Sequence, residues 1–195
     1  MKKVLLLLAN GFEAYEASVF TDVLGWNLLE GDGTTKVVTC GLRKTLKSTW
    51  NFTVLAETTA EEIDVSEYAA LAIPGGFEEA GFYEDAFHED FLAIIRKFDQ
   101  AGKPIASICV GALPVAKSGV LAGRKGTTYH LGGVRRKQLA GLGVEVVEQP
   151  VVVDGNIVTS SSPATALDVA YRLLEMLTTP GNCREVRRLM GFGEG

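Results

Sequence analysis

Two kinds of apolar segment alternate along most of this chain, and this alternation constrains the fold more than any other feature of the sequence. Short runs of branched and aliphatic residues predict buried strands, whereas longer segments with apolar residues at helical spacing predict amphipathic helices. Because strands that alternate with helices form a mostly parallel sheet covered on both faces, we expect an α/β fold. The predicted strands are residues 2–9, 35–42, 52–57, 68–76, 103–109, 125–129, 144–149 and 151–160. The predicted helices are residues 12–30, 84–102, 132–143 and 163–177, with a further helix after Cys109.

The size and punctuation of the chain predict one domain. A length of 195 residues suits a single large core, and no Pro/Ser-rich stretch or charge block marks a boundary within residues 1–195. Asp154 and Gly155 predict a hairpin turn inside the last strand region. The amino-terminal apolar run is too short for a signal peptide and has no small-residue cleavage site after it, so it is predicted to be the first strand.

The composition argues against several classes of protein. A net charge of −5 and a pI near 5.2 oppose nucleic-acid binding, and we expect the basic stretches 133–139 and 184–190 to be solvated helix faces. No apolar run approaches the roughly 18 residues that cross a bilayer. Cys40, Cys109 and Cys183 form no C-x-x-C pair, which argues against a disulfide framework and a zinc site. We expect a soluble, cytoplasmic protein with reduced thiols and no bound metal.

Cys109 stands where a predicted strand gives way to a helix. The segment Ser107-Ile-Cys-Val-Gly111 is close to the G-x-S-x-G elbow, in which small residues around a nucleophile let strand and helix approach at a sharp turn; Ser107 replaces the first glycine. Such a turn holds its central residue in a sparsely populated conformation at a cost of about 1–3 kcal/mol. The pattern favours a nucleophile, but a buried cysteine also occurs as an ordinary small core residue.

Three loops are predicted at one edge of the sheet. They are "ANGFEAYE" after the first strand, "IPGGFEEAG" after the fourth, and the Cys109 turn. In parallel sheets, sites lie beyond the carboxyl ends of the strands, so these loops are the candidate site. The chain has neither a G-x-G-x-x-G nor a P-loop signature, and we expect no nucleotide and no other cofactor.

The segments "LLLLANGFEAYEA", "LAIPGG" and "ASICVGA", in this order, resemble the ThiJ/PfpI superfamily, and within it the branch of the parkinsonism-associated deglycase. The run "DGNIVTSSSPATALDVAYRLLE" resembles the last strand and helix of that superfamily, which leaves residues 179–195 as a C-terminal extension. The resemblance implies a flavodoxin-like three-layer sandwich related to class I glutamine amidotransferases, which is usually a homodimer. It also implies an elbow cysteine, Cys109, beside a glutamate from the first loop, Glu16.

Elementary electrostatics supports this pair. The amino end of a helix favours a thiolate at Cys109. An ionised Glu16 would oppose it, but a desolvated and protonated Glu16 could donate its O–H to the sulfur and lower the pKa of the thiol. The alternative reading of Glu16 is an exposed acid in the first turn of a helix, and Glu13 fits that reading equally well.

Backbone groups of the other two loops suggest an oxyanion hole. The N–H groups of Gly75, Gly76 and Val110 could converge on a substrate oxygen. The alternative is a plain turn after Pro74. Ser161, with the serine that follows it, is interpreted either as a cap of the last helix or as part of the pocket.

The position after the cysteine argues against peptide hydrolysis. Superfamily members proposed to be peptidases have histidine there, whereas this chain has Val110 and lacks that general acid and base. The deglycase branch places a histidine in the loop after the next short strand. Here Tyr129 falls at that position and His130 follows it, so both are candidates for the pocket.

These observations predict a cysteine-dependent, cofactor-free enzyme that acts on small reactive carbonyl compounds, of the glyoxalase or deglycase type, through a thiohemiacetal at Cys109. Addition to an aldehyde needs an oxyanion site and one group that moves a proton, a role that Glu16 can fill. One alternative is an oxidative-stress sensor or chaperone that acts through oxidation of Cys109. An isocyanide hydratase or a peptidase is a further alternative with less support.

Overall fold

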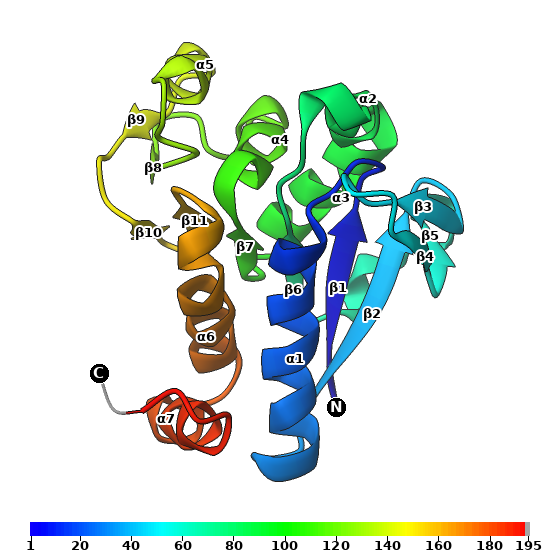
Figure 1. Cartoon of the computed structure of the whole chain (residues 1–195), viewed down its shortest axis with the longest axis vertical. Coiled ribbons are helices and arrows are strands. Elements are labelled where there is room, and N and C mark those ends of the chain that lie inside the picture. The colour runs from blue at the N-terminus through cyan, green and yellow to red at the C-terminus, as the bar shows by residue number, and fades with distance from the viewer. Residues whose placement is uncertain (194–195) are drawn as a thin grey trace.

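A seven-stranded sheet runs through the centre of the computed structural model, which describes residues 1–193 (Figure 1). Its strand order is β10-β11-β7-β6-β1-β2-β5, and every neighbouring pair is parallel except the hairpin of β10 and β11. The predicted α/β fold with a mostly parallel sheet is confirmed, as is the hairpin turn at Asp154 and Gly155. The strands are β1 (Lys2–Leu8), β2 (Thr35–Gly41), β5 (Thr58–Thr59), β6 (Ala70–Ile73), β7 (Ile105–Ser107), β10 (Val151–Asp154) and β11 (Ile157–Ser160).

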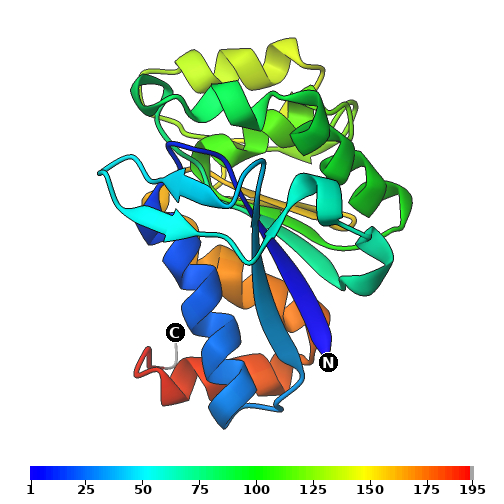
Figure 2. The same ribbon diagram turned by 90° about the vertical axis from the view of Figure 1, so that its right-hand side faces the viewer.

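Helices cover both faces of this sheet and make a three-layer sandwich, with the sheet between the two helical layers in Figure 2. One face carries α1 (Ala14–Glu30) and α6 (Ala166–Leu177), and α7 (Pro180–Leu189) packs across the ends of both. The other face carries α3 (Glu89–Gln100) and α4 (Ala112–Lys117). Shorter elements are α2 (Phe82–Ala86), α5 (Val134–Gly141) and the 3₁₀ turns Ala60–Glu62, Val65–Glu67, Glu78–Ala80, Cys109–Gly111 and Pro163–Thr165.

The central strand β1 shows why the sequence folds this way. Residues 4–8 are all buried, because β1 is paired on both edges and covered on both faces. A strand in that position needs a continuous apolar run rather than an alternating one. The loop after its last residue, Leu8, begins at the carboxyl edge of the sheet, where the candidate site was predicted.

Four predicted elements differ from the structure, one helix and three strands. The helix expected over residues 84–102 is interrupted, because α2 ends at Ala86 and α3 begins at Glu89, where Nδ1 of His88 accepts a hydrogen bond from the N–H of Asp90 at 3.3 Å. The strand expected over residues 52–57 does not join the main sheet. Instead, β4 (Thr53–Leu55) pairs with β3 (Thr45–Lys47) as a separate hairpin, and β8 (Lys125–Gly126) pairs with β9 (Glu145–Val146) as another small sheet.

The first basic stretch is less solvated than predicted. Arg135 pairs with Glu78 at 2.8 Å and Arg136 pairs with Glu148 at 3.1 Å, and the two arginine side chains are only 22% and 23% exposed. Both acids lie outside the basic stretch, and Glu78 is 57 residues away from Arg135, so the pattern around the arginines could not show that their side chains are held against the surface. In the second stretch, Arg187 covers the ring of Tyr171 at 5.3 Å.

The segment after the last predicted strand and helix contains α7, which is tied to the body of the protein. The Nδ2 group of Asn182 donates to Oδ1 of Asn27 on α1 at 2.6 Å, and Val186 is buried. None of the helices in residues 1–193 combines the length and apolar character required to cross a membrane.

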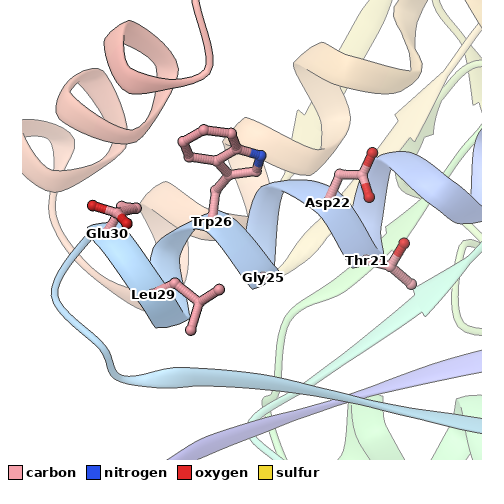
Figure 3. Close-up of a pocket in the computed structure, with 6 residues that line it drawn as sticks. All are labelled: Thr21, Asp22, Gly25, Trp26, Leu29 and Glu30. Atoms are coloured by element: carbon pink, nitrogen blue, oxygen red, sulfur yellow. The ribbon is translucent and has the colours of Figure 1, made fainter.

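Two glycines give a matched test of this packing. A Cβ atom on Gly111, just before α4, would lie 2.8 Å from the carbonyl oxygen of Ile73 and 3.0 Å from that of Pro74, so a side chain there must push the strand and helix apart. Gly25 lies in a shallow hollow on the outer face of α1, beside Trp26 (Figure 3), where an added Cβ meets no atom within 4 Å.

Gly111→Ala is therefore expected to lower the free energy of unfolding by about 1–3 kcal/mol through overpacking. Gly25→Ala is expected to raise it by about 0.5–1 kcal/mol, because alanine loses less backbone entropy in a helix. Urea denaturation of the two variants and the parent measures both changes. A Gly111→Ala variant as stable as the parent would contradict the tight strand-to-helix turn.

Candidate active site

The turn at Cys109 has the backbone geometry expected of an elbow. One residue, Ile108, separates Cys109 from the end of β7. Cys109 begins the 3₁₀ turn that leads into α4, and its φ is 54°. Within residues 1–193 the only other non-glycine residue with positive φ is Asn51. A cysteine lacks the freedom of glycine in this region, so the conformation stores strain that surrounding contacts must hold.

Two buried hydroxyl groups brace the strained residue. The N–H of Cys109 donates to Oγ of Ser160 at 3.4 Å, and Oγ1 of Thr128 donates to the carbonyl oxygen of Cys109 at 2.9 Å. Ser160 ends β11, which is the neighbour of β7, and Thr128 follows β8. Neither residue was predicted from the sequence. The only signal was a hydroxyl residue at the end of a strand, which is too common to be informative without the strand order.

Glu16 is the buried partner of this turn. It lies in the first turn of α1 with 0% exposure, and its Oε2 atom accepts a hydrogen bond from the N–H of Gly75 at 2.6 Å. Its Oε1 atom has no hydrogen-bond partner in the described part of the chain. The same two loops are also joined by their backbones, since the N–H of Glu13 donates to the carbonyl oxygen of Gly75 at 2.8 Å. The interpretation of Glu16 as an exposed helix-end acid is therefore wrong.

Burial controls the charge of Glu16. Loss of solvation raises the pKa of this carboxyl to about 8, and the charge of Glu13 also raises it, while the N–H of Gly75 and the thiol of Cys109 act in the opposite direction. Glu16 is therefore mostly protonated at neutral pH. A protonated carboxyl has an O–H to donate, and the unpartnered Oε1 atom is available for that role.

The surroundings of Cys109 differ from the sequence-based expectation of a thiolate. The side chain is 6% exposed, and burial raises the pKa of the thiol. An ionised Glu16 would raise this pKa further, whereas the N–H of Val110, which is directed at the sulfur, lowers it. The stabilisation of a thiolate by the helix end is therefore smaller than the cost of removing the thiolate from solvent. The repulsion from Glu16 disappears when Glu16 is protonated, so the ionisation of the two groups is coupled.

The predicted oxyanion donors are used differently from one another. The N–H of Gly75 is occupied by Glu16, so Gly75 positions the acid instead of facing a substrate. No partner for the N–H of Gly76 is found among residues 1–193, and Gly76 has no room for a side chain because its Cβ would strike the carbonyl oxygen of Gly11 and the ring of Phe82. Gly76 thus remains as a candidate donor with an unpaired N–H, and Val110 is a candidate whose N–H also interacts with the sulfur of Cys109.

The predicted pocket residues follow the two hydroxyl residues that brace the turn, but within residues 1–193 they make no hydrogen bond to its central pair. Nδ1 of His130 lies 3.1 Å from the carbonyl oxygen of Ser161, and the rings of Tyr129 and His130 are 5.9 Å apart. In the described chain, none of these three side chains hydrogen-bonds to Cys109 or Glu16. The predicted serine cap of the last helix is also absent, because no side chain caps the turn at Pro163–Thr165.

A groove of about 570 Å³ lies along α4, the helix that follows the elbow, and its wall includes Tyr83, a residue that was not predicted from the sequence. Leu113, one helical turn after Cys109, forms part of its wall, together with Tyr83 from α2 and Arg135 from α5. The guanidinium of Arg135 lies 5.1 Å from the centre of the Tyr83 ring. A single tyrosine in a helical segment has no sequence signal that separates it from a core residue.

The other thiols have no comparable surroundings. Cys40 is buried in β2, where loss of solvation raises its pKa to about 12. Cys183 on α7 is half-buried, and burial also raises its pKa. No group of three or more His, Cys, Asp or Glu side chains in residues 1–193 is arranged to hold a metal ion.

The raised pKa of Glu16 predicts how stability changes with pH. The folded chain keeps the Glu16 proton up to about pH 8, whereas the ordinary pKa is 4.5, so between these values the folded state binds more protons. The stabilisation is complete below pH 4.5 and is lost as the pH rises toward 8, with a slope of up to about 1.4 kcal/mol per pH unit. Glu16→Gln keeps an acceptor for Gly75 but cannot titrate. Urea unfolding at pH 5, 6.5 and 8 should show a smaller decline for the variant, and equal declines would contradict the buried acid.

Comparisons with known proteins agree with this arrangement. The sequence profile of the DJ-1/PfpI family matches residues 2–176. Deglycase PH1704 of Pyrococcus horikoshii is 35% identical over 162 residues, which cover 83% of this chain and 91% of that protein. Deglycase PfpI of Pyrococcus furiosus is 33% identical over 161 residues, which cover 83% of this chain and 90% of that protein. The crystal structure of Drosophila melanogaster DJ-1beta superposes with a TM-score of 0.86 at 26% identity and covers 99% of each chain. This chain therefore belongs to the DJ-1/PfpI family, whose flavodoxin-like α/β fold it shares.

Proposed function

We propose that this protein is a cofactor-free cysteine enzyme that adds Cys109 to small reactive carbonyl compounds, of the glyoxalase or deglycase type. One observation carries the proposal: a cysteine in a strained, left-handed turn lies against a buried carboxyl whose pKa is raised to about 8. The relatives named deglycases support the same class of activity. An ordinary core cysteine requires neither the strain nor the buried acid.

The proton balance of the proposed addition follows from the protonated pair. The sulfur of Cys109 forms a bond to the carbonyl carbon, and the carbon–oxygen π pair moves onto the oxygen. Glu16 gives its proton to that oxygen and takes the proton that leaves the thiol, so both the acid and the overall charge are restored. The product is a thiohemiacetal, and the step needs no leaving group.

For methylglyoxal the proposed reaction continues by proton transfer. The hydrogen on the carbon bonded to sulfur leaves as a proton and returns to the neighbouring carbon through an enediol, which gives a thioester of lactate. Water then cleaves the thioester and restores the thiol, so methylglyoxal and water become lactate. In this scheme Glu16 moves the proton, and the N–H groups of Gly76 and Val110 stabilise the oxygen on which charge develops.

Cys109→Ser is expected to fold normally and to lose consumption of methylglyoxal, because a hydroxyl is a far weaker nucleophile and no histidine adjoins it. Cys183→Ser is the matched control and should retain full activity, since Cys183 lies on α7 away from the elbow. Loss of methylglyoxal over time measures both variants, and circular dichroism verifies the fold. If the parent leaves methylglyoxal untouched while peroxide cleanly oxidises Cys109, the sensor alternative replaces this proposal.

Glu16→Leu distinguishes a protonated donor from an ionised neighbour. Loss of a hydrogen bond to a charged group, worth about 1.5–3 kcal/mol, should raise the pKa of Cys109 by about one to two pH units and slow alkylation near neutral pH. If Glu16 instead carried a charge in the parent, its removal would lower the pKa. Thiolate absorbance against pH measures the direction, and an unchanged or lower value in the variant would defeat the proposed role of Glu16.

A further inference from the structure

The hydroxyl of Tyr83 is buried and has no hydrogen-bond partner within residues 1–193. Buried tyrosine hydroxyls normally find a partner, and leaving one unpaired is costly. The mechanism described above does not use this group. Its isolation therefore calls for a ligand that supplies the missing acceptor.

The ring of Tyr83 is held in place on several sides. It stacks on Phe87 with ring centres 4.8 Å apart, and it meets Phe82 edge to face at 5.2 Å. The guanidinium of Arg135 covers the ring at 5.1 Å and is itself held by Glu78 at 2.8 Å. These contacts restrict the directions in which the hydroxyl can turn, so the donor is positioned before any ligand arrives.

The groove also places Tyr83 beside the helix that follows the reacting cysteine. Charge on Cys109 contributes to the raised pKa of Tyr83, yet no hydrogen bond joins the two side chains. Burial is the main cause of that rise, to about 12, so the group remains a donor throughout the physiological range. Tyr83 and Leu113 share the groove that begins one turn beyond Cys109. The arrangement leaves, beside this helix, a donor that is not bonded to the sulfur.

We propose that Tyr83 is a specificity-determining residue whose hydroxyl donates a hydrogen bond to the second carbonyl oxygen of a 1,2-dicarbonyl compound bound at Cys109. This inference rests on the proposed function. The oxygen of the attacked carbonyl already has Glu16, Gly76 and Val110 as candidate donors. Tyr83 is therefore available for the second carbonyl oxygen. A simple aldehyde has no second oxygen to accept this hydrogen bond, and Tyr83 therefore favours dicarbonyl compounds over monoaldehydes.

Reversible protection of Cys109 tests this inference without requiring turnover. The concentration of methylglyoxal that half-protects Cys109 from iodoacetamide is compared with that of propanal, an aldehyde with the same number of carbons. Tyr83→Phe should raise the half-protecting concentration of methylglyoxal by roughly three- to tenfold, the effect of one lost hydrogen bond. The half-protecting concentration of propanal should stay unchanged. Tyr171→Phe is the matched control, since Tyr171 lies on α6, away from α2 in Figure 1, and its hydroxyl donates to Met190.

The outcomes separate this inference from the proposed function. Protection by methylglyoxal without its consumption would reject the enzyme proposal and still measure the role of Tyr83. Equal changes for both carbonyl compounds, no change for either, or no protection of the parent by methylglyoxal would overturn the inference. Tyr83→Phe should also melt at or above the temperature of the parent, because no protein hydrogen bond is lost. A clearly lower melting temperature would identify a structural partner and overturn the inference as well.

Discussion

The hydrogen bond from Gly75 to Glu16 is the contact on which the rest of the site depends. It joins the start of α1 to the loop after β6, and the 2.6 Å bond is buried. An added Cβ on Gly75 would lie 2.9 Å from Oε2 of Glu16 and 3.1 Å from the backbone nitrogen of Val110, so all three loops meet at this glycine. Close backbone approach is what this position requires. Without it, the carboxyl would regain solvent and its charge.

Burial gives the site its chemical character. Desolvation raises the pKa of both Glu16 and Cys109, and the two groups are close enough for each to affect the other. An ionised acid beside a thiolate is the least favourable combination, because both charges are negative and both are desolvated. Two neutral groups are therefore the favoured combination. The N–H of Gly75 and the thiol of Cys109 favour a charged Glu16, and the N–H of Val110 favours a charged Cys109.

Much of this arrangement was predictable from local pattern. The alternation of apolar runs and helical segments specified the parallel sheet, and the small residues around Cys109 indicated a tight turn, which the φ of 54° matches. Features that depend on distant partners were not predictable. The N–H of Gly75 is taken by Glu16, a residue far away in the sequence, and the role of Tyr83 depends on a hydroxyl that has no partner within residues 1–193. In each case tertiary contacts decide between local alternatives.

The strain and the burial together make the proposed reactivity conditional on the ligand. The hydroxyls of Ser160 and Thr128 hold Cys109 in its left-handed conformation, so the position of the sulfur is fixed before binding. Its proton, however, is held firmly, because burial raises the pKa of the thiol. A carbonyl oxygen that enters the site offers Glu16 an acceptor for its proton, and the acid can then receive the proton of the thiol. Under the proposed function, the substrate itself completes the proton path that activates the nucleophile.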